Sequence, residues 1–217
     1  MSSYALLLSG GNVENPANSS SEKPKEVVII IHGIISSRLV TRVLERRLQH
    51  LGYTTHNWSY PSSFGSLEKH AAQLHNALEE YSQSGTRVHL VAHSMGAIVA
   101  RLALSYGSHS CLGRVVLLAP PNHGSPVARF LGPLFWPICP AATQLSSHPH
   151  SFVNQLAQPL DREIGIISAR YDMLVPNKST HLEGQQDTIC LAATHNSLLF
   201  QKSVIRYIDK FLATGKF

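Results

Sequence analysis

The chain has 217 residues, 43% hydrophobic and 14% charged, which suits a single domain with a substantial core and excludes global disorder. Lysine and arginine number 18 against 13 aspartates and glutamates, a formal charge of +5. The basic residues are scattered, which excludes a basic arm for nucleic acid but is compatible with peripheral contact with an anionic membrane surface. No stretch reaches the roughly 18 apolar residues of a membrane span.

The N-terminal part of the chain has the composition of a flexible segment. Residues 9–26 are rich in glycine, asparagine, serine and proline, so we expect 1–24 to form a flexible leader. The apolar run 4–8 is short for a signal-peptide core and no basic residue precedes it, and the three cysteines form no disulfide framework. We therefore expect a cytoplasmic protein whose residues 25–217 form one domain.

Three runs of aliphatic residues predict strands that are covered on both faces, as in a parallel sheet between helices. These runs are 25–31, 88–92 and 115–119, and weaker strand candidates are 54–59, 164–169 and 188–192. Apolar residues recur at helical spacing in the stretches 39–51, 67–81, 97–104 and 198–212. The alternation favours an α/β fold with a mostly parallel central sheet of about six strands flanked by helices.

The segment 120–160 interrupts this alternation. It is rich in proline, glycine and serine, and its apolar run 130–138 is too short to span a membrane. Long connections inside compact domains are often functional. We expect this segment to form a lid or a substrate pocket, and a packed flap without mobility is the alternative.

The sequence Ala92-His93-Ser94-Met95-Gly96 lies between a predicted buried strand and a predicted helix. A sharp strand-to-helix turn strains its central residue and requires small neighbours two positions away, as Ala92 and Gly96 are. Such a turn lifts the Ser94 hydroxyl above the sheet at a helix N-terminus, which favours developing negative charge. The alternative is that Ser94 is an ordinary helix N-cap.

These residues resemble the nucleophile elbow of the α/β-hydrolases, G-x-S-x-G, with alanine in place of the first glycine. The resemblance extends over about residues 25–213. A second match is His32-Gly33-Ile34, directly after the first strand. The resemblance implies that Ser94 is a nucleophile and that the backbone N–H groups of Ile34 and Met95 form an oxyanion hole.

The resemblance also implies an acid and a base in the order serine, acid, histidine. Asp172 follows the predicted strand 164–169 in a loop that continues into Val-Pro, like the acid loop of the family. The rival acids Asp161, Glu163 and Asp187 precede strands, so we expect them at the opposite end of the sheet.

The base is predicted from its place after the last strand. His195 is one of 13 histidines, but it follows the strand 188–192 and precedes the last predicted helix, which is the family's position for the catalytic histidine. His181 is the rival base, although a strand still follows it. The resemblance implies that His93 and His123 are non-catalytic, since histidines at these places are common in this fold.

The stretch 119–128, Ala-Pro-Pro-Asn-His-Gly-Ser-Pro-Val-Ala, and the run from Ser94 to Arg101 resemble those of bacterial triacylglycerol lipases and GPI-inositol-deacylase-like lipases. We expect Gly124-Ser125 to form a helix-capping turn. The predicted acyl-binding residues are Phe130, Leu131, Leu134, Phe135 and Trp136. The chain is too short for a large cap domain, so the site is expected to be open.

The resemblance implies a serine-dependent carboxylic ester hydrolase that acts on a small-molecule or lipid ester with an apolar acyl chain. A thioesterase or an acyltransferase with the same triad, and a non-catalytic binding protein with this fold, are the alternatives. No metal-ligand motif or Gly-rich phosphate loop is present, so neither a metal nor a cofactor is predicted.

Overall fold

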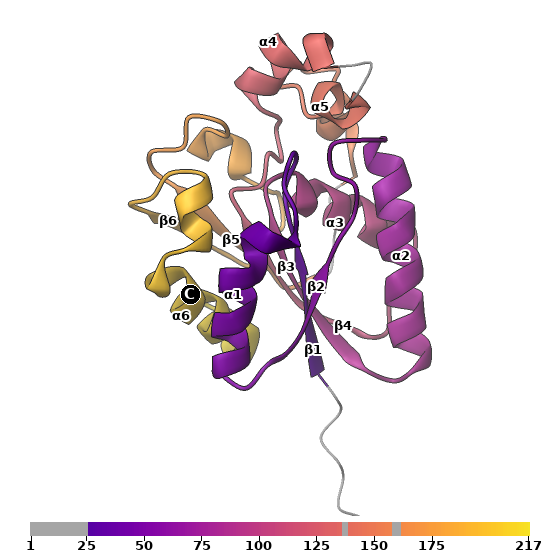
Figure 1. Ribbon diagram of the computed structural model, residues 1–217, viewed down its shortest axis with the longest axis vertical. Helices are drawn as coiled ribbons and strands as arrows, with labels where there is room; N and C mark the ends of the chain where they lie inside the picture. The colour runs from indigo at the N-terminus through magenta and orange to yellow at the C-terminus, as the bar shows by residue number, and fades with distance from the viewer. Residues whose placement is uncertain (1–25, 136–138, 158–161) are drawn as a thin grey trace, which may run out of the picture.

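The computed structural model describes residues 26–135, 139–157 and 162–217. Within these residues, six strands form one parallel sheet in the order β2-β1-β3-β4-β5-β6 (Figure 1). The strands are β1 Glu26–Ile31, β2 Thr54–Trp58, β3 Arg87–His93, β4 Leu112–Leu118, β5 Ile164–Ala169 and β6 Asp187–Leu191. The predicted fold class is therefore confirmed, and the predicted leader 1–24 lies outside the described residues.

Helices cover both faces of this sheet. Helices α1 and α6 pack on one face, and α2 and α3 pack on the other (Figure 1). The α-helices are α1 Arg38–His50, α2 Leu67–Gln83, α3 Met95–Ser105, α4 Pro126–Phe135, α5 Pro140–Gln144 and α6 Lys202–Thr214. Short 3₁₀-helices are η1 Phe152–Gln155, η2 Asn177–Thr180 and η3 Asn196–Leu199. In the described ranges, no helix has the length and hydropathy of a membrane span.

Strand β1 shows why the sheet needs helices on both faces. Ile29 and Ile31 are buried in the core on the α2–α3 side, while Val28 and Ile30 are buried on the α1–α6 side. Successive side chains of a strand point to opposite faces, so an entirely apolar strand must be covered on both. Each such side chain contributes about 1.5–3 kcal/mol when it is fully buried.

Helices α4 and α5 lie in the segment 120–160, where the sequence pattern predicts no helix. Gly132 and Pro133 weaken the helical pattern there, yet Gly132 is the point where α4 rests against α5. A Cβ atom on Gly132 would lie 3.0 Å from the carbonyl oxygen of Ala142. The tertiary contact between the two helices thus overrides the poor helix propensity of the segment.

Two predicted boundaries are corrected by the structure. The helix predicted over 198–212 is interrupted, because η3 ends at Leu199 and Gln201 adopts an extended backbone (φ −77°, ψ 131°) before α6 begins. Strand β4 begins at Leu112 instead of residue 115, because Leu112 pairs with Val88 of β3. Both differences lie at element ends, and the order of the elements is unaffected.

Candidate active site

The carboxyl ends of four parallel strands bring the predicted site residues to one edge of the sheet. Gly33 follows β1, Ser94 follows β3, Asp172 follows β5 and His195 follows β6. Parallel strands end on the same side, so residues far apart in the sequence meet there. The site is therefore a product of the topology.

Ser94 occupies a strained turn between β3 and α3. Its φ of 54° and ψ of −125° are unfavourable for a residue with a side chain, and its N–H donates to the Leu118 carbonyl at 2.9 Å. The Ser94 hydroxyl makes no capping hydrogen bond to α3, so the ordinary N-cap interpretation is wrong. The turn also requires Gly96, where a Cβ atom would lie 2.4 Å from the His32 carbonyl oxygen.

A chain of two hydrogen bonds links Ser94, His195 and Asp172. The Ser94 Oγ lies 2.9 Å from Nε2 of His195, and Nδ1 of His195 lies 2.6 Å from Oδ2 of Asp172. All three side chains are almost fully buried. With Nδ1–H donating to the carboxylate, Nε2 carries the lone pair that accepts from the Ser94 hydroxyl.

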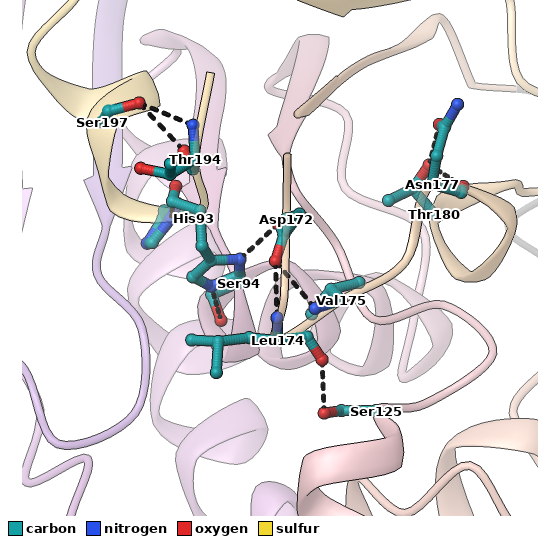
Figure 2. Close-up of polar contacts among 11 residues, drawn as sticks. His93, Ser94, Ser125, Asp172, Leu174, Val175, Asn177, Thr180, Thr194 and Ser197 are labelled. Atoms are coloured by element: carbon teal, nitrogen blue, oxygen red, sulfur yellow. Dashed lines mark hydrogen bonds and ion pairs between the residues drawn. The ribbon is translucent and has the colours of Figure 1, made fainter. Parts of the chain in front are cut away.

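Asp172 is held in place by backbone groups of its own loop. Its Oδ1 accepts from the N–H groups of Leu174 at 2.9 Å and Val175 at 2.8 Å (Figure 2). Burial alone raises the pKa of this carboxyl, but hydrogen bonds from His195, Val175 and Leu174 outweigh burial and lower its pKa below the usual range. Asp172 is therefore ionised at neutral pH and oriented toward His195.

Ser125 connects the Asp172 loop to helix α4. Its hydroxyl donates to the Leu174 carbonyl at 2.6 Å (Figure 2) and accepts from the Ala128 N–H at 3.3 Å. The second contact is the helix cap that the sequence predicts at this position. The Ser125 hydroxyl thus connects helix α4, which lines the cavity, to the loop that carries Asp172.

His93 lies directly beside His195. Its Nε2 donates to the His195 carbonyl at 3.2 Å, and the two ring centroids are 4.8 Å apart. Burial, aided by the neighbouring His195, lowers the pKa of His93 from 6.5 to about 3. His93 is therefore neutral and supports the backbone of His195.

The backbone after β1 packs directly against Ser94. A Cβ atom on Gly33 would lie 3.0 Å from Cβ of Ser94, so a side chain there would force the Ser94 turn to shift by a few tenths of an ångström. Ile35 has a φ of 47°, a strained value for a β-branched residue. Ile34 directly follows Gly33, and Met95 directly follows Ser94. Met95 opens helix α3, where N–H groups favour negative charge.

A cavity of about 310 Å³ opens beside Ser94 and His195. Its lining is predominantly apolar and comes from the β1–α1 loop, from α4 and α5, and from the loop after Asp172. The apolar lining residues include Ile34, Val40, Val127, Ala128, Leu131, Ala142, Leu145, Leu174, Val175 and Leu199. An apolar chain would fit this cavity with one end at the Ser94 hydroxyl.

A comparison with protein families agrees with this architecture. The sequence profile of the alpha/beta hydrolase family matches residues 28–188 of the chain. The protein belongs to the alpha/beta hydrolase family. The match begins within β1 and includes the Ser94 turn and the Asp172 loop. No curated protein matches the sequence.

Solved structures with the same fold include several lipases and a related protein. Bacillus licheniformis lipase BlEst2 in its mature form aligns with a TM-score of 0.75 and 18% identity, covering 90% of this chain and 95% of that chain. Aspergillus fumigatus lipase B aligns with a TM-score of 0.70 and 15% identity, covering 87% of this chain and 52% of that one. A lipase-esterase related protein from Clostridium acetobutylicum aligns with a TM-score of 0.64 and 15% identity, covering 87% and 95%. At these identities the likeness establishes the fold.

The structure places the predicted acyl-binding residues differently from one another. Leu131 lines the cavity, whereas Phe130 and Leu134 are 79% and 75% exposed and are not part of its lining. They lie on the outer side of α4, whose inner side carries Val127, Ala128 and Leu131. The Phe135 side chain and Trp136 lie outside the described residues. Residues 126–135 form a helix, and the helical spacing of these side chains places them on an inner and an outer side of α4. This spacing is the sequence signal that distinguishes lining from exposed residues.

Of the rival residues that the structure describes, Glu163, Asp187 and His181 make no hydrogen bond to Ser94 or His195. Glu163, just before β5, forms an ion pair with Arg114 at 3.0 Å. Asp187 opens β6 and accepts from the Phe217 N–H at 2.9 Å. His181 is exposed in the loop after η2, and Asp161 lies outside the described residues.

Two residues of the lipase-like stretches meet behind the site. Arg101 is buried, and its guanidinium donates to Oδ1 of Asn122 at 2.9 Å. The Asn122 side chain then donates to the Thr180 carbonyl at 2.7 Å. Burial lowers the pKa of Arg101 to about 10, which still leaves it charged at neutral pH. This buried connection holds α3, the segment after β4 and η2 together.

Proposed function

We propose that this protein is a serine-dependent carboxylic ester hydrolase acting on a small-molecule or lipid ester with an apolar acyl chain. The observation that carries the proposal is the hydrogen-bonded series Ser94–His195–Asp172 beside an apolar cavity. The same series in a polar or closed site would not favour this chemistry.

In the proposed reaction, Ser94 Oγ attacks the ester carbonyl while Nε2 of His195 takes its proton. Asp172 holds the imidazole in the required tautomer and stabilises its charged form. The N–H groups of Ile34 and Met95 donate to the oxyanion of the tetrahedral intermediate. His195 then returns the proton to the leaving alcohol, and water cleaves the acyl-enzyme by the same sequence of steps.

The exposed apolar residues near the cavity support peripheral contact with a lipid surface as part of this proposal. Ile35, Phe130, Leu134 and Met173 are each more than two-thirds exposed. Ile35 lines the cavity, and each of the other three lies within two residues of a lining residue. A lipid surface would cover these side chains and present ester groups to Ser94. We expect the protein to pellet with anionic liposomes, and absence of pelleting at every salt concentration would exclude this contact.

The test of the activity compares purified wild type with Ser94→Ala. We expect a fluorophosphonate probe to label wild type only, and p-nitrophenyl esters of medium or long chain to be hydrolysed faster than acetate. Equal thermal unfolding of the two proteins is the control that both are folded. Absence of labelling in folded wild type would contradict the proposal and favour the non-catalytic binding protein.

A further inference from the structure

Two histidines and a glutamate gather at a second place in the molecule. His75 and Glu79 lie four residues apart on α2, so their side chains project from the same side of the helix. His109 lies between α3 and β4, the next segment packed on this side of the sheet. One ligand atom from each of the three residues lies within 4.8 Å of the others.

We infer that His75, Glu79 and His109 form a binding site for a divalent transition-metal ion of the zinc type. This site goes beyond the proposed hydrolase function and does not depend on it. Two imidazoles and one carboxylate are ligands that such ions accept, with water completing the coordination.

His109 is the member of the cluster whose surroundings point to a ligand. Its side chain is 0% exposed, and Nδ1 lies 2.9 Å from a carboxylate oxygen of Glu79. Nevertheless, among the described residues this nitrogen has no hydrogen-bond partner, so the ring N–H is not aligned with the oxygen. A buried polar atom without a partner is costly, and a metal ion between the three side chains would satisfy it.

The spacing of the ligand atoms suits such an ion after small movements. His109 offers the ion its Nδ1, because its Nε2 lies 3.4 Å from the carbonyl oxygen of Ala103, to which a ring N–H donates. The His75 and His109 ring centroids are 5.0 Å apart, and the three ligand atoms lie within 4.8 Å of one another. Tetrahedral zinc ligands at about 2.0–2.2 Å from the ion lie roughly 3.3 Å from one another. Glu79 is 43% exposed, so its side chain is free to adjust, and the exposed side gives the ion a route of entry.

The position of the cluster assigns the ion a structural role. Helix α3 begins at the Ser94 turn and ends at Ser105, before His109. Eleven residues of α-helix span roughly 16 Å, so the cluster lies far from the reacting serine. An ion there would tie α2 to the segment between α3 and β4 without contacting the substrate.

The experiment uses the full chain, freed of metal with EDTA and titrated with zinc chloride or cobalt chloride. We expect one tight equivalent, visible-region absorption from bound cobalt, and a Tm rise of roughly 5–10 °C at zinc concentrations 100-fold above Kd. His75→Gln and Glu79→Gln are the primary variants, because both side chains are partly exposed and their replacement should not prevent folding. Each should weaken zinc binding at least tenfold.

The matched control is the double variant His148→Gln/His150→Gln. These two rings also lie close together, 5.7 Å apart, but in an exposed loop. This control should retain the tight equivalent and the Tm rise. The inference is overturned if His75→Gln and Glu79→Gln bind zinc as tightly as wild type does. It is also overturned if the control loses the tightly bound zinc ion, because the exposed His148 and His150 would then hold an adventitious ion only. Ester hydrolysis by the metal-free protein is measured separately, so failure here leaves the proposed hydrolase function unaffected.

Discussion

At the scale of single residues, the decisive feature is how firmly the surroundings of Asp172 and His195 orient them. One carboxylate oxygen of Asp172 accepts hydrogen bonds from two backbone N–H groups, and the other oxygen accepts one from His195. His195 is supported from behind by the neutral ring of His93. The orientation of the imidazole therefore depends on neighbours that do not touch substrate.

The first prediction concerns Asp172. Asp172→Asn retains an oxygen for the Leu174 and Val175 N–H groups but removes the charge, and its amide donates where a carboxylate accepted. This favours the wrong tautomer of His195, so we expect kcat for ester hydrolysis to fall about 10³- to 10⁴-fold. The matched control is Asp187→Asn, at the opposite end of the sheet, which should leave kcat unchanged. An equal loss in both variants would show that Asp172 has no special role.

The second prediction concerns His93 and pH. The folded protein binds a proton on His93 only near pH 3, whereas the ordinary pKa of 6.5 applies after unfolding. Between these values the unfolded state binds more protons, so the free energy of unfolding decreases as pH falls, by about 1.4 kcal/mol per pH unit from this residue. His93→Gln removes this contribution. Urea unfolding from pH 6.5 to 4.5 should therefore give a shallower pH dependence for the variant, and parallel curves would refute the prediction.

At the scale of elements, the hydrophobic pattern of the sequence predicts the strands better than it predicts helices α4 and α5, which line the cavity. Val27 to Ile31 is apolar at every position, which only a strand covered on both faces explains well. The placement of Ser94, Asp172 and His195 after strands follows from the same pattern. Helices α4 and α5 could not be predicted in this way, because Gly132 and Pro133 disfavour a helix locally and only the contact with Ala142 compensates. The exposed positions of Phe130 and Leu134 follow from that missed helix.

The third prediction tests the contact between α3 and β1. In a helix, Gly→Ala ordinarily stabilises by up to about 1 kcal/mol. At Gly96 the new Cβ would lie 2.4 Å from the His32 backbone oxygen. This clash outweighs the gain in helix propensity, so the substitution should destabilise the fold. We expect Gly96→Ala to destabilise the fold by about 1–3 kcal/mol and to reduce ester hydrolysis. Gly107→Ala is the control, because its Cβ would meet only the His75 ring at 3.4 Å. Chemical denaturation of both variants distinguishes this clash from a general intolerance of alanine.

At the scale of the whole molecule, the cavity exists only where distant parts of the chain meet. The β1–α1 loop, the strand ends and the α4–α5 pair each supply part of its wall. No local pattern contains this information, since each segment alone is an ordinary loop or short helix. The cavity wall is therefore the part of the site that is least predictable from the sequence. It is also the part that would select the acyl chain.

The last prediction follows from the size of that cavity. Ala142 on α5 lines the volume of about 310 Å³, so Ala142→Phe should fill part of it. Esters with long acyl chains then lose contacts that short esters never make, and kcat/KM should fall roughly tenfold more for long chains than for acetate. Phe130→Ala is the control on the outer side of α4, where 79% exposure puts the ring outside the cavity. In soluble monomeric substrates this variant should keep the wild-type chain-length profile. A change of profile in Phe130→Ala, with none in Ala142→Phe, would mean that the acyl chain lies along the outside of α4 instead of inside the cavity.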